Sequence, residues 1–409
     1  MHGISRNLAQ FGQQLAQVFL VGMTLGMVRT VVPALAESEF SVERGSYLLL
    51  TVFVVAFGFV KGTMNFVAGR TADRFGRKPV LLAGWLSALP APWLILYATS
   101  WNEVVLATLL LGINQGLCWS ATQASKLDLA HARERGFAVG LDEFSGYMGV
   151  AVAGVATGYL ATGLDAREAL WGFGLTCILL AIGLLLGFVR ETLPWAHREQ
   201  EATDTSPETT PATTWEAFAE VSWRDRRLFA VSQAGLVEKF VDTLVWIFYP
   251  VYLYAHGFSL LHIGWIVGIY GTVWGASQFL TGRLSDRVGR LIPCVAGMWL
   301  CGIGVLVSLW SLQFVTWAIS AAITGFGMAL LYPNLSAAIS DLAAPAWRGS
   351  AIGIYRFWRD LGYGIGALGL GILASLTGYL EAGFYGVAIS MFASGGLLAW
   401  LGPRRSAPS

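Results

Sequence analysis

The chain has 409 residues, of which 55% are hydrophobic and 12% are charged, and its formal net charge is +1. Soluble proteins usually have about a quarter of charged residues, so this composition excludes an ordinary soluble domain. The basic residues are dispersed over short polar segments, which excludes a basic surface for nucleic acid. A mean hydropathy of +0.60 predicts a multi-pass membrane protein.

Twelve apolar runs of about 20 residues, long enough to cross a bilayer core as helices, follow one another along the chain. They cover residues 15–33, 47–68, 79–98, 104–126, 136–160 and 170–189, and then 228–253, 263–280, 291–312, 314–339, 349–376 and 382–401. The first run lacks a basic cluster before it and a cleavage site after it, so we expect a retained helix and not a signal peptide. The sequence predicts an all-α membrane protein of twelve transmembrane helices, in which residues 1–190 and 223–409 form two six-helix bundles.

Residues 191–222 separate the two bundles. Their core is rich in Glu, Thr, Pro and Ala, too polar to be buried and without helical periodicity, which indicates a cytoplasmic linker. From Trp215 to Arg227 aromatic residues alternate with acids and then with arginines. This pattern fits either a short interfacial helix or simple positive-inside anchors.

The two bundles are copies of one repeat with an offset of 213 residues. GRTADRFGRK at residues 69–78 returns as GRLSDRVGRL at residues 282–291. The same offset relates Asp128, Arg135, Gly136 and Gly140 to Asp341, Arg348, Gly349 and Gly353. Because each copy holds six spans, both copies run in the same direction through the membrane as parallel repeats.

Basic residues fix the orientation. With a cytoplasmic N-terminus, 19 of the 26 Lys and Arg residues lie in cytoplasmic segments, five lie inside spans, and only Arg44 and Arg167 lie outside. The positive-inside rule therefore predicts cytoplasmic N- and C-termini. We expect a monomer in the plasma membrane, the inner membrane of a bacterium.

Twelve helices in two parallel sixes, a polar middle linker, and Gly-x-x-x-Asp-Arg-x-Gly-Arg after helices 2 and 8 resemble the major facilitator superfamily of secondary transporters. The resemblance covers essentially the whole chain. It implies that helices 1, 4, 7 and 10 line a central cavity, that helices 2, 5, 8 and 11 form its sides, and that helices 3, 6, 9 and 12 face lipid. The last four have no charged residue in their interiors, as expected when a charge near a span centre costs about 2.5–3.5 kcal/mol or more.

Two pairs of repeat-equivalent positions are charged with inverted sign. Arg29 corresponds to Asp242, and Glu143 corresponds to Arg356. If helices 1 and 7 meet across the pseudo-twofold axis, Arg29 and Asp242 form an ion pair between the bundles that opens and closes with the transport cycle. The alternative is that each charge is neutralised within its own bundle.

Helix 7 places Glu238 and Asp242 on one face, with Lys239 turned about 100° away. Two carboxylates on one cavity face favour holding a proton near neutral pH, which is what proton coupling requires. Adjacent side chains diverge, so only one of Asp142 and Glu143 faces the cavity, and we favour Glu143 because its equivalent is charged.

On helix 11, Arg356 and Asp360 share a face, and a structural ion pair is expected there. Asp360 alternatively neutralises Lys61 of helix 2. Trp119 and Tyr332 are repeat equivalents, so their rings either clamp a planar solute or only pack between helices. Further polar cavity candidates are Asn65, Asn114, Gln115 and Asn334.

The repeated cytoplasmic motifs point to gating. In the family, the motif aspartate docks at a helix N-terminus of the opposite bundle, and the arginine pairs with an acid at the foot of helix 4, which latches the cytoplasmic side. The glycines are expected to let the loops turn. The gating residues are Gly69, Asp73, Arg74, Gly76, Arg77 and Asp128, and then Gly282, Asp286, Arg287, Gly289, Arg290 and Asp341.

The four cysteines fall within spans, so neither disulfides nor a metal cluster is expected, and no cofactor is predicted. We find no nucleophile with a base and no phosphate loop, which disfavours an enzyme. The sequence predicts a secondary transporter of a small organic solute, coupled to protons, that works by alternating access. The alternatives are a multidrug efflux pump and a non-transporting sensor. Helix 5 lacks the proline of proton-coupled drug exporters and helix 4 lacks their arginine, which disfavours drug export.

Overall fold

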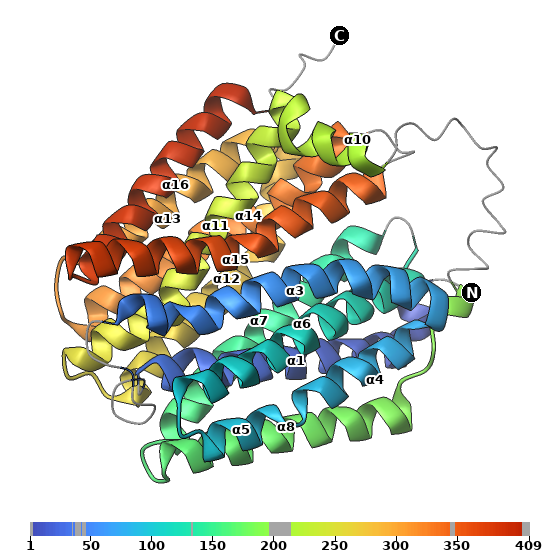
Figure 1. Cartoon of the computed structure of the whole chain (residues 1–409). Helices are drawn as coiled ribbons and strands as arrows, with labels where there is room; N and C mark the ends of the chain where they lie inside the picture. Colours follow the sequence, from blue (N-terminus) through green and yellow to red (C-terminus); the bar gives the residue numbers. More distant parts are fainter. Residues whose placement is uncertain are drawn as a thin grey trace.

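The computed structural model describes residues 3–34, 36, 42, 46–131, 134–195, 214–343 and 348–402, and the regular structure in these ranges is helical. The N-terminal half contains α1 Leu8–Ala34, α3 Tyr47–Phe75, α4 Arg77–Ala88, α5 Ala91–Tyr97, α6 Trp101–Leu129, α7 Arg135–Leu160 and α8 Ala166–Phe188. The C-terminal half contains α11 Arg226–Ala255, α12 Leu260–Val288, α13 Leu291–Ser308, α14 Phe314–Leu342, α15 Arg348–Thr377 and α16 Glu381–Leu401. Figure 1 shows the two halves side by side.

The predicted twelve spans are present among the described residues, with one correction. The third span begins at Arg77 and is not a single helix. It is interrupted at Leu89 and Pro90, which separate α4 from α5. Proline has no backbone N–H, so Pro90 cannot donate the hydrogen bond that would extend α4. Both pieces together still cross as one span, so the architecture of two six-helix bundles holds.

Ten of these spans are apolar enough to cross a membrane by length and composition alone. The two that fall short are α7 and α11, which carry Glu143, Glu238 and Asp242, three of the charged residues assigned to the cavity from sequence. Both lie inside the molecule, α7 between α1 and α12, and α11 against α1, α14 and α15. Surrounding protein thus replaces lipid around the most polar spans, as intramembrane charge requires.

Local side-chain chemistry fixes several helix starts. Asp165 accepts hydrogen bonds from the backbone N–H groups of Arg167 and Glu168 at the start of α8. Asp225 accepts from two backbone amides at the start of α11, and Ser259 accepts from one at the start of α12. These caps satisfy amides that have no partner inside the helix.

The segment before α11 is helical and packs on the C-terminal half. It consists of α10, Thr214–Ala219, and a π-helical turn, Glu220–Arg224. Phe218 lies 5.8 Å from the ring of Trp358 on α15, and the indole N–H of Trp358 donates to Ser222 over 2.8 Å. The short helix expected after Trp215 therefore ends at Arg224, before α11 begins.

The halves meet where α3 runs along α15 and α7 runs along α12 (Figure 1). Small residues make this approach possible. A Cβ atom on Gly58 of α3 would lie 2.4 Å from the backbone nitrogen of Gly364 on α15. The interface is therefore closed by backbone contact and leaves no room for a side chain at this position.

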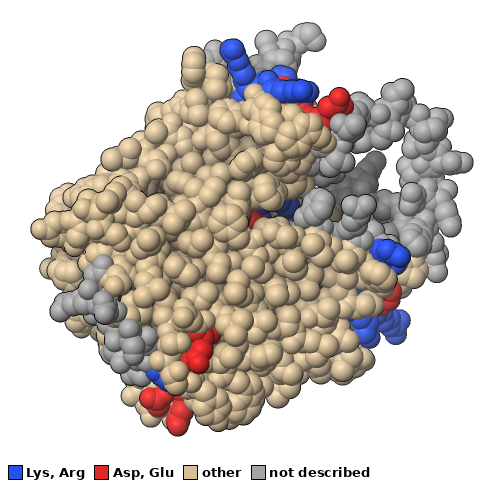
Figure 2. Space-filling model, in the orientation of Figure 1, with Lys and Arg blue, Asp and Glu red and all other residues tan. Residues whose placement is uncertain are grey.

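Among the described residues, close backbone contacts between the halves are concentrated at one end of the interface. We call the end that holds Glu191 and α10 the linker face, and the other end the opposite face. Close contacts between α7 and α12 run from Gly158, at the opposite face, to Gly275. A Cβ atom added to Gly140 of α7, or to its equivalent Gly353 of α15, would meet no described neighbour within 4 Å near the linker face. Figure 2 shows the hollow between the halves, with acidic and basic atoms at its bottom.

Candidate functional site

Arg29 and Asp242 form the ion pair that the repeat predicted. The guanidinium of Arg29 donates two hydrogen bonds to the carboxylate of Asp242, over 2.7 and 3.1 Å, and both side chains are fully buried. The hydroxyls of Tyr363 and Tyr270 donate to the same carboxylate, and Arg29 lies over the ring of Trp246. The predicted ion pair between the halves is confirmed, and every side of it is covered by protein.

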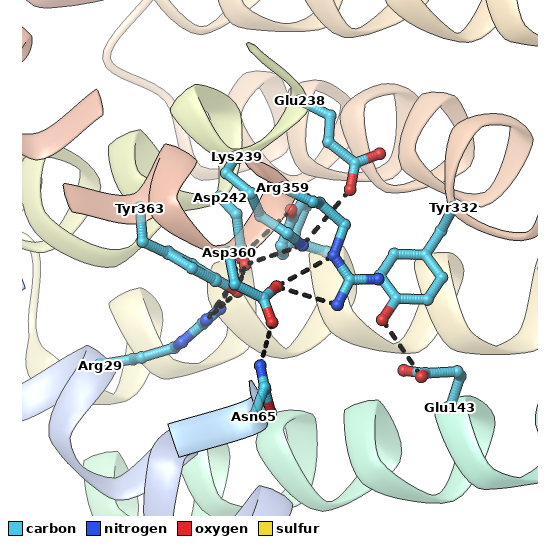
Figure 3. Close-up of polar contacts among 11 residues, drawn as sticks. Arg29, Asn65, Glu143, Glu238, Lys239, Asp242, Tyr332, Arg359, Asp360 and Tyr363 are labelled. Atoms are coloured by element: carbon cyan, nitrogen blue, oxygen red, sulfur yellow. Dashed lines mark hydrogen bonds and ion pairs between the residues drawn. The ribbon is translucent and has the colours of Figure 1, made fainter. Parts of the chain in front are cut away.

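A small cavity of about 20 Å³ lies between the halves and has room for little more than a water molecule. Its lining includes four basic and two acidic side chains among the described residues. The lining residues are Lys61, Asn65, Trp119, Ser120, Glu143, Tyr147, Lys239, Tyr332, Arg356, Arg359 and Asp360. Figure 3 shows how several of these side chains converge from both halves.

Glu143 joins the two halves through hydrogen bonds. Its Oε1 accepts from the indole N–H of Trp119 over 3.3 Å and from the hydroxyl of Tyr332 over 3.1 Å. These repeat-equivalent rings therefore share one acceptor, rather than only packing. The neighbouring Asp142 points away from the cavity and pairs with Lys126 over 2.5 Å. Glu143 is thus the member of the pair that lines the cavity, as the charged equivalent position indicated.

Asp360 has a different partner from the ones considered from sequence. It pairs with the adjacent Arg359 over 2.9 Å and accepts a hydrogen bond from Asn65 across the interface (Figure 3). Neither Arg356 nor Lys61 forms an ion pair with a carboxylate of the described residues. The reason is geometric, because Asp360 reaches Asn65 of α3, while Arg359 lies over the ring of Tyr332 on α14.

Lys61 lies among aromatic rings. Its Nζ is 5.7 Å from the ring centroid of Phe57, 5.4 Å from that of Trp119 and 5.2 Å from that of Tyr363. An ammonium over aromatic faces is partly compensated for lost hydration. Lys61 therefore presents a positive charge to the cavity that an anion could neutralise.

The prediction of which residues of the seventh span, α11, face the cavity needs a correction. Lys239 lines the cavity, while Glu238 does not, so the basic residue is not turned away. The Nζ of Lys239 lies 3.5 Å from Glu238 and 3.9 Å from Asp242. Residues 241–250 of α11 are all buried, so α11 has no single cavity face, and simple helical periodicity could not assign one.

Three polar candidates pack within their own half. Asn114 donates to the carbonyl of Gly84 over 3.0 Å, and Gln115 donates to the carbonyl of Val21 over 2.7 Å. Asn334 donates to the carbonyl of Leu330 one turn earlier. All three are buried outside the cavity lining. The amides of Asn114 and Gln115 satisfy backbone groups of neighbouring helices, and that of Asn334 bonds within α14. Bonding to backbone is a common use of a buried polar side chain.

The repeated motifs form the expected ion pairs at the linker face. Arg77 pairs with Asp128 over 2.9 Å, and Arg290 pairs with Asp341 over 3.2 Å. The first pair is more than nine-tenths buried, whereas the Asp341 side chain is 60% exposed. Sequence equivalence predicted both contacts but not this difference in burial.

The motif glycines require one correction. Gly69 lies within α3 and Gly282 within α12, so these two do not form a turn. Gly76 and Gly289 do, with φ of 100° and 87°, which is the region that favours glycine. Arg74 is exposed and its guanidinium lies over Phe75. The side chains of Asp73, Asp286 and Arg287 lie outside the described residues.

Sequence reasoning missed a contact from the start of the linker. Glu191 accepts hydrogen bonds from the backbone N–H groups of Arg77 and Lys78 over 2.9 and 3.0 Å, at the start of α4. Thr192 donates to Asp128 over 2.9 Å. Burial raises the pKa of Glu191, but its backbone N–H donors outweigh burial and lower the pKa below its usual range. An acidic residue next to a helix end is too common to single out from sequence.

Comparison with known proteins identifies the family. A model of the Major Facilitator Superfamily matches residues 15–237 and 231–409. An uncharacterized MFS-type transporter of Salmonella typhimurium is 22% identical over 381 residues, which cover 90% of each chain. A probable 4-methylmuconolactone transporter of Cupriavidus pinatubonensis is 25% identical and covers 85% of this chain and 83% of its own. The 3-(3-hydroxy-phenyl)propionate transporter of Escherichia coli is 28% identical over 38% of this chain and 40% of its own.

Solved structures share the fold. The D-xylose-proton symporter superposes with a TM-score of 0.75 at 16% identity and covers 97% of this chain and 98% of its own. The human organic anion transporter MFSD10 superposes with a TM-score of 0.70 at 17% identity and covers 96% and 99%. The twelve spans, the repeat and the family match agree, and the chain belongs to the Major Facilitator Superfamily of membrane transporters.

Proposed function

We propose that this transporter carries a small organic carboxylate together with protons, by alternating access across the inner membrane of a bacterium. The observation that carries the proposal is the charge of the cavity. Four basic side chains and two acidic ones line it, and neither Lys61 nor Arg356 has a carboxylate partner among the described residues. A solute carboxylate would neutralise this excess charge, which is otherwise costly to bury.

Aromatic walls favour a planar or ring-bearing carboxylate. Trp119, Tyr147 and Tyr332 line the cavity, and their flat faces would pack on an unsaturated or cyclic solute. Two relatives are named as transporters of 3-(3-hydroxy-phenyl)propionate and 4-methylmuconolactone. Both names support a search among aromatic acids and related cyclic acids.

The distribution of basic residues supports placing the linker face on the cytoplasmic side of the membrane. This conformation would then open to the cytoplasm. Alternating access would then require the halves to part at the opposite face and close at the linker face. The Arg29–Asp242 pair and the motif ion pairs would form or break between these states. In this scheme the cavity residues Lys61 and Arg356 contact the solute, and the motif residues act as latches.

The test is solute uptake into liposomes by the purified protein. The panel contains aromatic carboxylates, organic cations and lipophilic drugs, each with an imposed pH gradient. We expect uptake of one carboxylate class, and we expect Lys61→Gln and Arg356→Gln to raise KM by roughly tenfold to a hundredfold, because each removes a charged hydrogen-bond donor. Arg224→Gln, which removes an exposed charge outside the cavity, is the matched control.

Preference for cations or lipophilic drugs would contradict the proposal and favour multidrug efflux. An absence of uptake across the whole panel, with a protein that is folded by thermal unfolding, would favour a sensor without transport. Unchanged KM values in both cavity variants would show that the solute binds elsewhere.

A further inference from the structure

Glu238 is a buried carboxyl group without a hydrogen-bond partner. Its side chain is fully buried in the middle of α11, and neither carboxyl oxygen has a hydrogen-bond partner among the described residues. The nearest cation is the Nζ of Lys239 at 3.5 Å, longer than the roughly 2.7–2.9 Å of a charge-assisted hydrogen bond. A buried carboxylate in this position is poorly compensated, so its neutral form is favoured.

Two neighbouring buried carboxylates, Asp242 and Glu143, do accept hydrogen bonds. Asp242 accepts from both ends of the Arg29 guanidinium and from Tyr363 and Tyr270. Glu143 accepts from an indole and a phenol on one oxygen, and its other oxygen has no hydrogen-bond partner among the described residues. Hydrogen bonds to a charged form favour that form. Among these three acids Glu238 is the one with no hydrogen bond on either oxygen among the described residues.

Lys239 connects Glu238 to the cavity. Its Nζ makes no hydrogen bond among the described residues and lies between Glu238 and Asp242, at 3.5 and 3.9 Å. It also lies about 5 Å from the ring centroids of Trp274, Tyr332 and Tyr363 and lines the cavity. Figure 3 shows Lys239 between the two acids. The ammonium is therefore shared, and is not committed to either carboxylate.

The N-terminal repeat has no charged pair at the equivalent positions. The equivalents of Glu238 and Lys239 in the N-terminal half are Leu25 and Gly26. Leu25 is buried in the core, and Gly26 packs against the backbone of Val150. The same helical position is therefore apolar in one half and charged in the other, which points to a task beyond packing.

We propose that Glu238 carries the coupling proton, and that its protonation releases Lys239 to bind the carboxylate of the solute. This inference rests on the proposed function. When ionised, Glu238 attracts the ammonium of Lys239, which lies 3.5 Å away and is shared with Asp242. A proton from the cavity converts the carboxylate to a neutral carboxyl group, no other bond changes, and the positive charge of Lys239 becomes available to an anion.

The scheme predicts how many protons move with each solute molecule and in which direction they move. One proton accompanies one negative charge of the solute, so proton and solute move in the same direction. The net charge carried with a monocarboxylate is zero, and the membrane potential alone does not drive its uptake. Other titratable or charged groups that face Glu238 from α11, α13 and α15 are Asp242, Cys294, Cys301, Tyr355 and Arg359.

The experiment compares two assays in liposomes that contain the purified protein and a transported carboxylate. Counterflow measures solute exchange without a proton gradient, and pH-driven accumulation measures coupling. We expect Glu238→Gln, which mimics the protonated acid, to keep counterflow within about threefold and to lose pH-driven accumulation and solute-induced proton flux. Glu168→Gln, the same chemical change at an exposed acid outside the cavity lining, is the control and should keep both assays at the wild-type level. Glu143→Gln tests the other glutamate near the cavity that Lys239 lines.

Several results would overturn the inference. One is pH-driven accumulation by Glu238→Gln at the wild-type level, and another is loss of coupling in Glu143→Gln instead. A third is loss of counterflow in a Glu238→Gln protein whose melting temperature is unchanged. A fourth is potential-driven uptake of a monocarboxylate without a pH gradient. If the wild-type protein shows no counterflow with any carboxylate, the proposed function itself fails. The two failures are thus distinguishable.

Discussion

Arg29 and Asp242, which occupy the same position of the two repeats, bind each other across the interface between the halves. Arg29 lies near the end of α1 at the opposite face, where the halves are closed, and its pair with Asp242 is fully buried. Parting the halves at that face would separate two charges in a dry environment. The pair therefore connects helix packing to the closed state of the opposite face.

Removal of one partner of this pair should be severe. Arg29→Ala or Asp242→Ala leaves an uncompensated buried charge, and we expect a loss of about 3–5 kcal/mol of stability, together with loss of transport. The double exchange Arg29→Asp with Asp242→Arg should regain part of both. Thermal unfolding and uptake measure this. A double exchange no better than either single variant would contradict a direct role for the pair.

The two latch ion pairs should differ in importance. Asp128→Asn breaks a pair that is buried and also accepts from Thr192, whereas Asp341→Asn breaks a pair whose acid is mostly exposed. Exposed ion pairs contribute roughly 0–1 kcal/mol, and buried ones more. We expect Asp128→Asn to lower the melting temperature and uptake more than its repeat equivalent does. Equal effects would show that burial does not set the strength of the latch.

Glu191 should contribute a pH-dependent cap to α4. In the folded protein the pKa of Glu191 is lowered, because burial raises it but the hydrogen bonds from backbone N–H groups lower it by more. Its stabilisation is therefore present above the unfolded pKa of about 4.3 and is lost as the pH falls below that value. Glu191→Ala should cost roughly 0.5–1 kcal/mol, the low end for a helix cap, because the group is partly exposed.

Hydrogen exchange of the Arg77 and Lys78 amides measures this cap. Exchange of these two amides should accelerate in Glu191→Ala at pH 7, and the difference from wild type should shrink toward pH 4 once intrinsic exchange rates are taken into account. A difference that is independent of pH would contradict capping by a carboxylate.

The closed interface should be sensitive to added side-chain volume. A Cβ atom on residue 58 would lie only 2.4 Å from a backbone atom of α15, so the side chain of Gly58→Val has no space. Such overpacking costs about 1–3 kcal/mol of stability. We expect at least a tenfold loss of uptake. Gly369→Val on α15, where a Cβ meets nothing within 4 Å, should stay within about twofold. Comparable losses in both variants would show that loss of a helical glycine, and not contact, is responsible.

Much of the fold followed from sequence. The apolar runs, the offset of the repeat and the distribution of charge predicted twelve helices and the Arg29–Asp242 pair. The interruption at Pro90 and the helical position of Gly69 were missed, because span length was inferred from hydropathy and motif glycines were assumed to form turns. The contact of Glu191 with α4 joins residues 114 apart, which no local pattern encodes.

The sequence by itself determined the membrane class, the two repeats and the equivalence of their positions, because hydropathy and spacing are properties along the chain. Tertiary structure decided which charges meet. Asp360 turned out to pair with Arg359, and Lys239 to face the cavity between two acids. The rotation of each helix about its axis is set by packing against neighbours distant in sequence, and in this protein that rotation decides which charges are compensated and which remain available to a solute or a proton.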